Sequence, residues 1–231
     1  MHEDLKQIQK RILDVAIGAL TQANHHAVFY DQHSSGWAEN AILSAANAGE
    51  LFLKAIVAKE HPLLIFKDLY QLDDAGQIEL KIEHIIERGK TYGLEHMPKL
   101  LWVTTGERMP DISSFEKLRK ARNSIQHFCS PDAEGDLQDL ARQFIYKNID
   151  PLINKHFNIC AIEFHEDHSI GYDYVVECLV RDELIFSIPH NFSITEVDLG
   201  EAMRNTSKKY QKKLTQLFRD NGISLSLLGI S

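Results

Sequence analysis

The chain has few cysteines, and their spacing excludes the common cysteine frameworks. Only three occur in 231 residues, and no two of them have the CxxC spacing of a zinc or redox site. An odd, scattered set predicts reduced thiols, as in cytosolic proteins, and no disulfide scaffold. The three are Cys129, Cys160 and Cys178.

Long apolar runs, repeats and low-complexity tracts are absent as well. No stretch approaches the roughly 20 apolar residues that span a bilayer. The first residues, MHEDL, are acidic and polar, unlike the basic start of a signal peptide. We therefore expect a cytoplasmic protein with no membrane-spanning segment.

Positive charge is scarce overall but concentrated in two places. The net charge of −8 argues against a protein that coats nucleic acid non-specifically. Residues 201–220, however, carry six basic side chains against two acidic ones, and residues 117–122 carry four basic side chains and no acidic one. The sequence thus allows a local basic groove on an acidic surface.

Helical periodicity dominates the first two thirds of the chain. Apolar residues recur at three- and four-residue steps, as in amphipathic helices. The segment 37–60 is Ala-rich and apolar nearly all round, which is typical of a central helix packed on several sides. We expect helices at about 4–30, 37–60, 77–89, 113–129 and 135–157. A long irregular connection is expected at 90–111, with a helical turn around Leu100-Leu101-Trp102.

Several residues mark the expected helix ends. Ser34 or Ser35 can cap the start of the second helix, and His61-Pro62 ends it, because proline pushes the preceding residue out of the helical region. Ser113 and Glu116 have the spacing of a capping box. Pro151 is expected to kink the helix at 135–157.

The pattern changes after residue 157. Residues 158–165 and 172–188 are rich in Ile, Val, Phe and Tyr, which predicts short antiparallel strands. A basic amphipathic helix at about 195–219 follows. The expected fold class is mainly α: an antiparallel helical bundle over 1–157 with a small C-terminal α+β domain over 158–231.

One cation lies where apolar side chains are expected. On a helical wheel, Arg122 falls within the apolar stripe of its helix, and a buried arginine needs a carboxylate, a second subunit or a phosphate as partner. Asn123 and His127 are four residues apart and share a face. If the last turn loosens, His127 can swing toward Arg122. The stripe consists of Phe115, Leu118, Ala121, Ile125 and Phe128.

These residues resemble those of a known family. The segment RNSIQH, residues 122–127, is similar to the Arg-x(4–6)-His motif of HEPN ribonucleases, including the polar residue after the arginine. The segment AGELFLKA, residues 48–55, resembles the A-x-E-x-x-x-K-A pattern in a core helix of many HEPN domains. The resemblance covers roughly 34–157, and we see no family match for 158–231.

The resemblance implies a HEPN-like bundle that acts as a metal-independent endoribonuclease, with no cofactor. The RNA 2′-hydroxyl would attack the adjacent phosphate, with His127 as general acid or base and Arg122 as the phosphate clamp. Asn123 would position either group, Arg119 and Lys120 would line the groove for RNA, and Glu50 would contribute to substrate binding. The resemblance further implies a homodimer, a role as a toxin or host-defence effector, and an antitoxin or regulatory protein as partner.

Plainer interpretations stay open beside this one. Arg122 can form a structural salt bridge with Glu50, with His127 as an exposed cation at the helix end that favours the helix dipole. Glu50 and Lys54 can also be a simple i,i+4 ion pair. The domain can also be a non-catalytic HEPN-like module that binds RNA or protein, or an adaptor in which 158–231 makes the recognition.

Two further clusters favour plain interpretations. The acidic and histidine side chains of 163–168 can ligate metal, but a solvated hairpin tip is favoured; they are Glu163, His165, Glu166, Asp167 and His168. The basic helix within 201–220 can grip RNA, but a solvated face is favoured narrowly.

Overall fold

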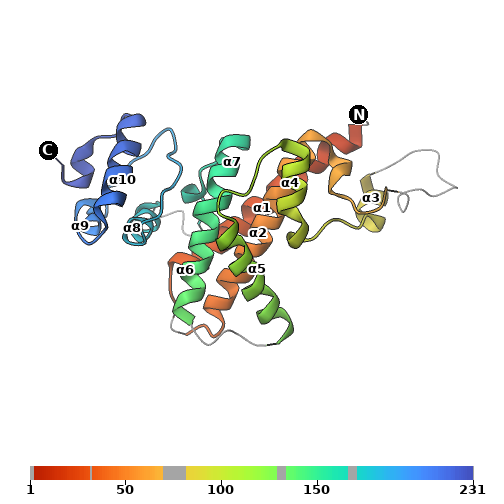
Figure 1. The fold of residues 1–231 in the computed structure, drawn as a ribbon, viewed down its shortest axis with the longest axis horizontal. Helices are drawn as coiled ribbons and strands as arrows, with labels where there is room; N and C mark the ends of the chain where they lie inside the picture. Colours follow the sequence, from red (N-terminus) through yellow and green to blue (C-terminus); the bar gives the residue numbers. More distant parts are fainter. Residues whose placement is uncertain (1–2, 32, 70–81, 129–133, 166–170, 231) are drawn as a thin grey trace.

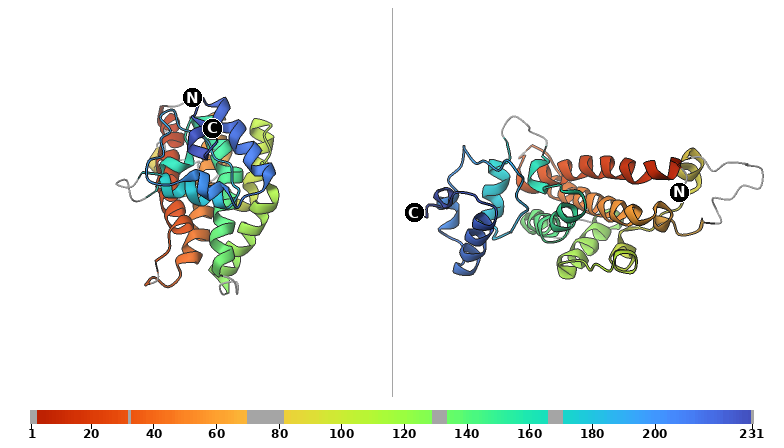
Figure 2. Two further views of the ribbon diagram at one scale, coloured as in Figure 1. Left: turned by 90° about the vertical axis from the view of Figure 1, so that its left-hand side faces the viewer. Right: turned by 90° about the horizontal axis from the view of Figure 1, so that it is seen from above.

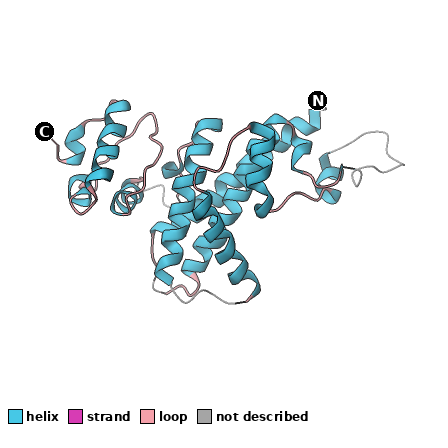
Figure 3. Ribbon diagram, in the orientation of Figure 1, coloured by secondary structure: helices cyan, strands magenta, loops and turns pink. Residues whose placement is uncertain are grey.

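The protein is mainly α-helical, as predicted, in the computed structural model, which describes residues 3–31, 33–69, 82–128, 134–165 and 171–230 (Figures 1 and 3). The α-helices are α1 (Glu3–Val28), α2 (Trp37–Glu60), α3 (Ile82–Arg88), α4 (Met97–Thr105), α5 (Ile112–His127), α6 (Glu134–Phe144), α7 (Asp150–Phe157), α8 (Asp173–Arg181), α9 (Leu199–Met203) and α10 (Lys208–Asp220). The 3₁₀-helical turns are η1 (Pro62–Ile65), η3 (Leu94–His96), η5 (Ala161–Glu163) and η6 (Leu225–Leu228), and η4 (Ile145–Ile149) is a π-helical turn.

Helices α1 and α2 form the centre of the bundle. They run side by side along the long axis (Figure 2), and fully buried alanines on both, such as Ala16 and Ala45, let the two backbones approach closely. Helix α2 has buried residues on all its faces, which confirms the predicted central helix. By length and composition alone α2 could cross a membrane, contrary to the sequence expectation, but 72% of its most apolar stretch is buried inside the protein, as in a core helix.

The C-terminal end of α2 agrees with the sequence prediction, and the N-terminal end does not. His61 leaves the helical region and Pro62 begins η1, as predicted. The serine cap is wrong: the N-cap is Gly36, which lies in the left-handed region with φ of 78° and makes no side-chain capping bond. Glycine adopts this conformation without a steric penalty, so the turn is set by its backbone.

The segment 90–111 contains the nine-residue helix α4, which includes the helical turn expected at 100–102 and extends it on both sides. Pro98 is in the first turn, where no intrahelical N–H bond is required, and Gly106 ends the helix with φ of 77°.

The predicted helix at 135–157 is interrupted just before Pro151, where the π-helical turn η4 separates α6 from α7. Proline has no N–H to continue the α-helical ladder across this point.

The predicted strands of the C-terminal part are wrong. Within the described residues of 158–188 the chain forms η5 and α8 and no strand. Val175, Val176 and Leu179 form the buried face of α8, so one-sided burial outweighs the β-propensity of valine. The basic helix expected at 195–219 is divided into α9 and α10, and the Ser207 hydroxyl caps α10 by accepting the N–H of Tyr210.

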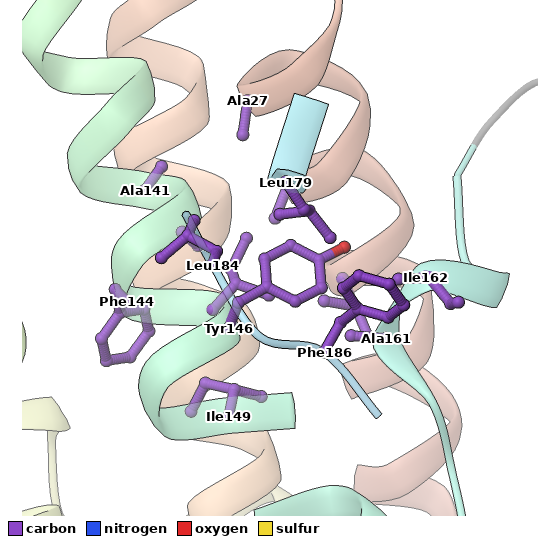
Figure 4. Close-up of a cluster of buried hydrophobic side chains, with 14 of the residues drawn as sticks. Ala27, Ala141, Phe144, Tyr146, Ile149, Ala161, Ile162, Leu179, Leu184 and Phe186 are labelled. Atoms are coloured by element: carbon purple, nitrogen blue, oxygen red, sulfur yellow. The ribbon is translucent and has the colours of Figure 1, made fainter. Parts of the chain in front are cut away.

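The C-terminal helices pack against the bundle through a shared hydrophobic core. In Figure 1 they gather at the end of the molecule opposite α3, beyond α7, where the predicted boundary at residue 157 falls. Tyr146 of η4 lies among Leu179, Leu184 and Phe186 of the C-terminal part (Figure 4).

A buried asparagine joins α1 to the C-terminal part. The Asn24 amide donates hydrogen bonds to the carbonyl oxygens of Ala161 and Phe164, both at 2.8 Å. Its own oxygen accepts the hydroxyl of Tyr146 at 3.0 Å. The Ala161 carbonyl also accepts the Phe164 N–H at 3.2 Å, whereas the Tyr146 hydroxyl is buried and depends on Asn24. Asn24 therefore stabilises the junction.

A buried carboxylate makes a second junction. Asp150 of α7 accepts the backbone N–H groups of Ala161 at 2.8 Å and Ser187 at 2.6 Å. Desolvation raises the pKa of the Asp150 carboxyl to about 6, although both hydrogen bonds act in the opposite direction.

We predict that Asn24→Ala lowers the free energy of unfolding by about 2–4 kcal/mol, because three hydrogen bonds are lost and the buried Tyr146 hydroxyl is left without its acceptor. Asn47→Ala, at an exposed position in the middle of α2, is the matched control and should change it by less than about 0.5 kcal/mol. Urea unfolding measures both. Equal effects for the two variants would contradict the proposed role of Asn24.

We also predict a pH effect at Asp150. Its folded pKa of about 6 lies above the unfolded value of about 3.9, so folding takes up a proton between these values. The resulting stabilisation is present at low pH and is lost as the pH rises through about 6. Relative to Asp150→Asn, the wild type should gain about 1 kcal/mol of unfolding free energy from pH 7 to pH 5. Urea unfolding measures both proteins at each pH. If the difference in unfolding free energy between the wild type and Asp150→Asn is the same at pH 5 and pH 7, the prediction is wrong.

Candidate functional site

Helix α5 carries the predicted site, and its first turn is held by two polar side chains. Asp111 caps the helix by accepting the N–H groups of Ser113 at 3.1 Å and Ser114 at 3.2 Å. The buried Asn148 of η4 accepts the Asp111 N–H at 2.7 Å and donates to the Asp111 carbonyl at 3.0 Å and the Ser114 hydroxyl at 2.8 Å. These bonds fix the start of α5 on the bundle.

The predicted capping box of α5 is wrong. The cap lies two residues before Ser113, at Asp111, since a carboxylate there reaches two free N–H groups. The Glu116 carboxylate instead pairs with the guanidinium of Arg119 at 2.8 Å, one helical turn further on.

The apolar stripe of α5 is buried only in the first part of the helix. Phe115 and Leu118 are fully buried and Ala121 is nearly so, as predicted. Ile125 is only half-buried, and Phe128 is 89% exposed, so its predicted inward position is wrong. Figure 1 shows α5 descending to the lower end of the bundle, and the exposed Phe128 follows its last turn.

Arg122 lies at the transition from the buried part to the exposed part. It is half-buried, and its Nη1 donates to Oδ1 of the adjacent Asn123 at 3.2 Å. In the part of the chain that the structure describes, it forms no ion pair. The structural Arg122–Glu50 salt bridge is therefore not formed there, and the guanidinium has no counter-anion among these residues.

Glu50 has a structural role on α2. Its carboxylate accepts the Lys54 ammonium at 2.6 Å and the backbone N–H of Leu94 at 3.0 Å. This confirms the i,i+4 ion pair. A part for Glu50 in substrate binding stays a prediction, and both carboxylate oxygens are already engaged.

Arg122 and His127 face apart within one chain. Helix α5 remains α-helical through His127, so the predicted loosening of the last turn does not occur. Five residues at 3.6 per turn place the two side chains roughly 140° apart around the axis. Asn123 and His127 do share a face, as predicted, and His127 is exposed at the helix end.

The solvent face of α5 is positively charged. The helix has four cationic side chains and one carboxylate, that of Glu116, which pairs with Arg119. Arg122 belongs to the apolar stripe, so Lys117 and Lys120 provide the charge of the solvent face. Lys117 and Lys120 are exposed and form no ion pair within the described residues. On a chain of net charge −8, this is a local site for a polyanion.

The two remaining clusters from the sequence are the possible metal ligands of 163–168 and the basic helix within 201–220. No group of three or more His, Cys, Asp or Glu side chains among the described residues is placed to hold a metal ion. Glu163 is exposed and His165 is buried, whereas residues 166–168 of that cluster lie outside the described part. The lysines of α10 are all exposed, on a solvated face.

Comparison of the chain with protein-family models, curated proteins and solved structures found no match in any of the three. The assignment of a function to α5 therefore rests on its residues and their geometry.

We predict that Arg122→Met changes the free energy of unfolding by less than about 0.5 kcal/mol, because no ion pair within the described residues is lost. The matched variant is Arg142→Met on α6. Arg142 is buried and bonded to Asp139, Asp182 and the Ala27 carbonyl, so its loss should cost roughly 2–4 kcal/mol. Urea unfolding measures both. A loss at Arg122 as large as that at Arg142 would show that Arg122 is structural.

Proposed function

We propose that the chain is a metal-independent endoribonuclease with a HEPN-like bundle, acting through α5. The observation that carries the proposal is the half-buried Arg122, held by Asn123 and without an ion pair in the described part of the chain. A partly desolvated guanidinium favours a bound anion, and its planar fork suits two phosphate oxygens. Lys120 and His127 are seven residues apart and share the other side of α5, so the cationic face attracts a nucleic-acid backbone beside the imidazole.

The chemistry needs only groups that α5 and RNA supply. A base removes the proton of the 2′-hydroxyl, whose oxygen attacks the adjacent phosphorus. The bond from phosphorus to the 5′-oxygen breaks, an acid protonates that oxygen, and a 2′,3′-cyclic phosphate remains. The exposed imidazole of His127 can accept or donate a proton and so serves either step. Arg122 stabilises the charge that builds on the phosphate oxygens.

The proposal requires a second copy of the chain. Since Arg122 and His127 project about 140° apart on one helix, a single phosphate contacts both only if they come from different protomers. Phe128 is 89% exposed directly after His127, and an exposed phenylalanine beside the site favours an interface there. In this arrangement, Arg122 of one protomer and His127 of the other act on the same phosphate.

The second candidate is a non-catalytic module that binds RNA. The observation that favours it is the same divergence of Arg122 and His127 on α5. A helix face with unpaired cations binds phosphates whether or not an imidazole reaches the 2′-hydroxyl.

The test incubates the purified protein with single-stranded RNA in the presence of EDTA. We predict cleavage that leaves 2′,3′-cyclic phosphate ends and no cleavage where the 2′-hydroxyl is replaced by hydrogen. His127→Ala should lower the rate by about 100- to 10,000-fold. His190→Ala, which removes another exposed histidine, should leave the rate unchanged.

Each other outcome has a distinct meaning. Cleavage that EDTA abolishes would contradict the metal-independent chemistry. Binding of RNA without any cleavage by the wild type would favour the binding module.

A further inference from the structure

A groove between α4 and α5 combines an exposed tryptophan with unpaired cations. It has a volume of about 410 Å³ and is lined by Pro98, Lys99, Trp102, Arg108, Met109 and Ile112, hereafter the Trp102 groove. Trp102 is 45% exposed and Ile112 is 52% exposed. Large side chains that remain this exposed on the walls of a groove favour a binding surface.

The tryptophan is held in a stack with an arginine. The guanidinium carbon of Arg108 lies 4.5 Å from the centre of the Trp102 ring. A cation over the ring face is attracted by the π electrons and orders both side chains. Indole rings and guanidinium planes are the two kinds of surface on which unpaired nucleobases stack in proteins that bind single strands.

The charges around the Trp102 groove suit an anionic ligand. Lys99 and Arg108 are exposed and form no ion pair within the described residues. The two acidic side chains of the segment between α4 and α5 are engaged elsewhere. Glu107 binds Lys155 at 2.8 Å and His156 at 3.1 Å, and Asp111 caps α5.

The Trp102 groove reaches α5 at Ile112. Ile112 begins a stripe that continues at three- and four-residue steps through Glu116 and Arg119 to Asn123 and His127. Ile112 and Asn123 are separated by about 16 Å along the helix axis. A stacked strand, with one phosphate about every 3.4 Å, covers that distance with about five nucleotides.

We propose that the Trp102 groove binds a nucleobase of single-stranded RNA, a few nucleotides from the phosphate at Arg122. The base stacks on the Trp102 and Arg108 pair, and Lys99 contacts the adjoining phosphate. This inference rests on the proposed function of α5 for the identity of the ligand. It adds a recognition site that selects single strands, because a base within a duplex is already stacked and paired.

The test measures binding of a labelled single strand of 2′-O-methyl RNA, which cannot be cleaved by 2′-hydroxyl attack. Trp102→Ala should raise the Kd by about 5- to 100-fold, the usual range for loss of one stacked base. Trp102→Phe should recover most of the affinity, and Arg108→Ala should weaken binding in the same direction. Val103→Ala, an exposed neighbour outside the groove, should bind as the wild type does.

A second readout observes the stack directly. The chain has two tryptophans, so Trp37→Phe leaves Trp102 as the only tryptophan, whose emission can be excited selectively. We expect the strand to quench its fluorescence and an abasic strand of equal length to quench it little.

The outcomes separate this inference from the proposed nuclease. If Trp102→Ala binds the strand as tightly as the wild type, or the wild type does not bind it, the groove proposal is overturned. If binding depends on Trp102 but cleavable RNA stays intact, the groove proposal stands and the nuclease fails. If Trp102→Ala changes only self-association, measured by light scattering, the groove is a protein interface and the proposal is overturned.

Discussion

The clamp of Asn148 on the start of α5 sets the position of everything that we assign a function. One buried amide makes three hydrogen bonds, to the Asp111 N–H, the Asp111 carbonyl and the Ser114 hydroxyl. It sits on the π-helical turn η4, just before Pro151. Because α5 is fixed at this end, both the Trp102 groove and the cationic face further along the helix have defined positions on the bundle.

The sequence predicted those parts of the fold that depend on local rules. The Ala-rich pattern of α2 and its end at His61-Pro62 were readable, because a helix apolar on all sides must be central and proline ends it. The strands predicted at 172–188 were wrong, because valines at helical spacing bury one face of α8 against the bundle. The choice between helix and strand there is made by tertiary packing, which composition does not contain.

The site was predictable as a set of residues but not as a geometry. The motif from Arg122 to His127 and the shared face of Asn123 and His127 follow from spacing on a helix. The exposure of Phe128 and the continued helix to His127 depend on where α5 leaves the core. The Trp102 groove was missed because it joins α4, of which only one turn was expected, to the start of α5. The one sequence signal for the groove was a tryptophan, Trp102, with basic residues at 99 and 108 on either side of it.

The central claim is that Arg122 and His127 act together across two copies of the chain, and mixing two inactive variants tests it most directly. Arg122→Ala and His127→Ala protomers that exchange into mixed dimers restore one intact site per mixed dimer. Random exchange should therefore recover about a quarter of the wild-type RNA cleavage rate. A mixture that stays as inactive as its two components, although mixed dimers have formed, would contradict the account.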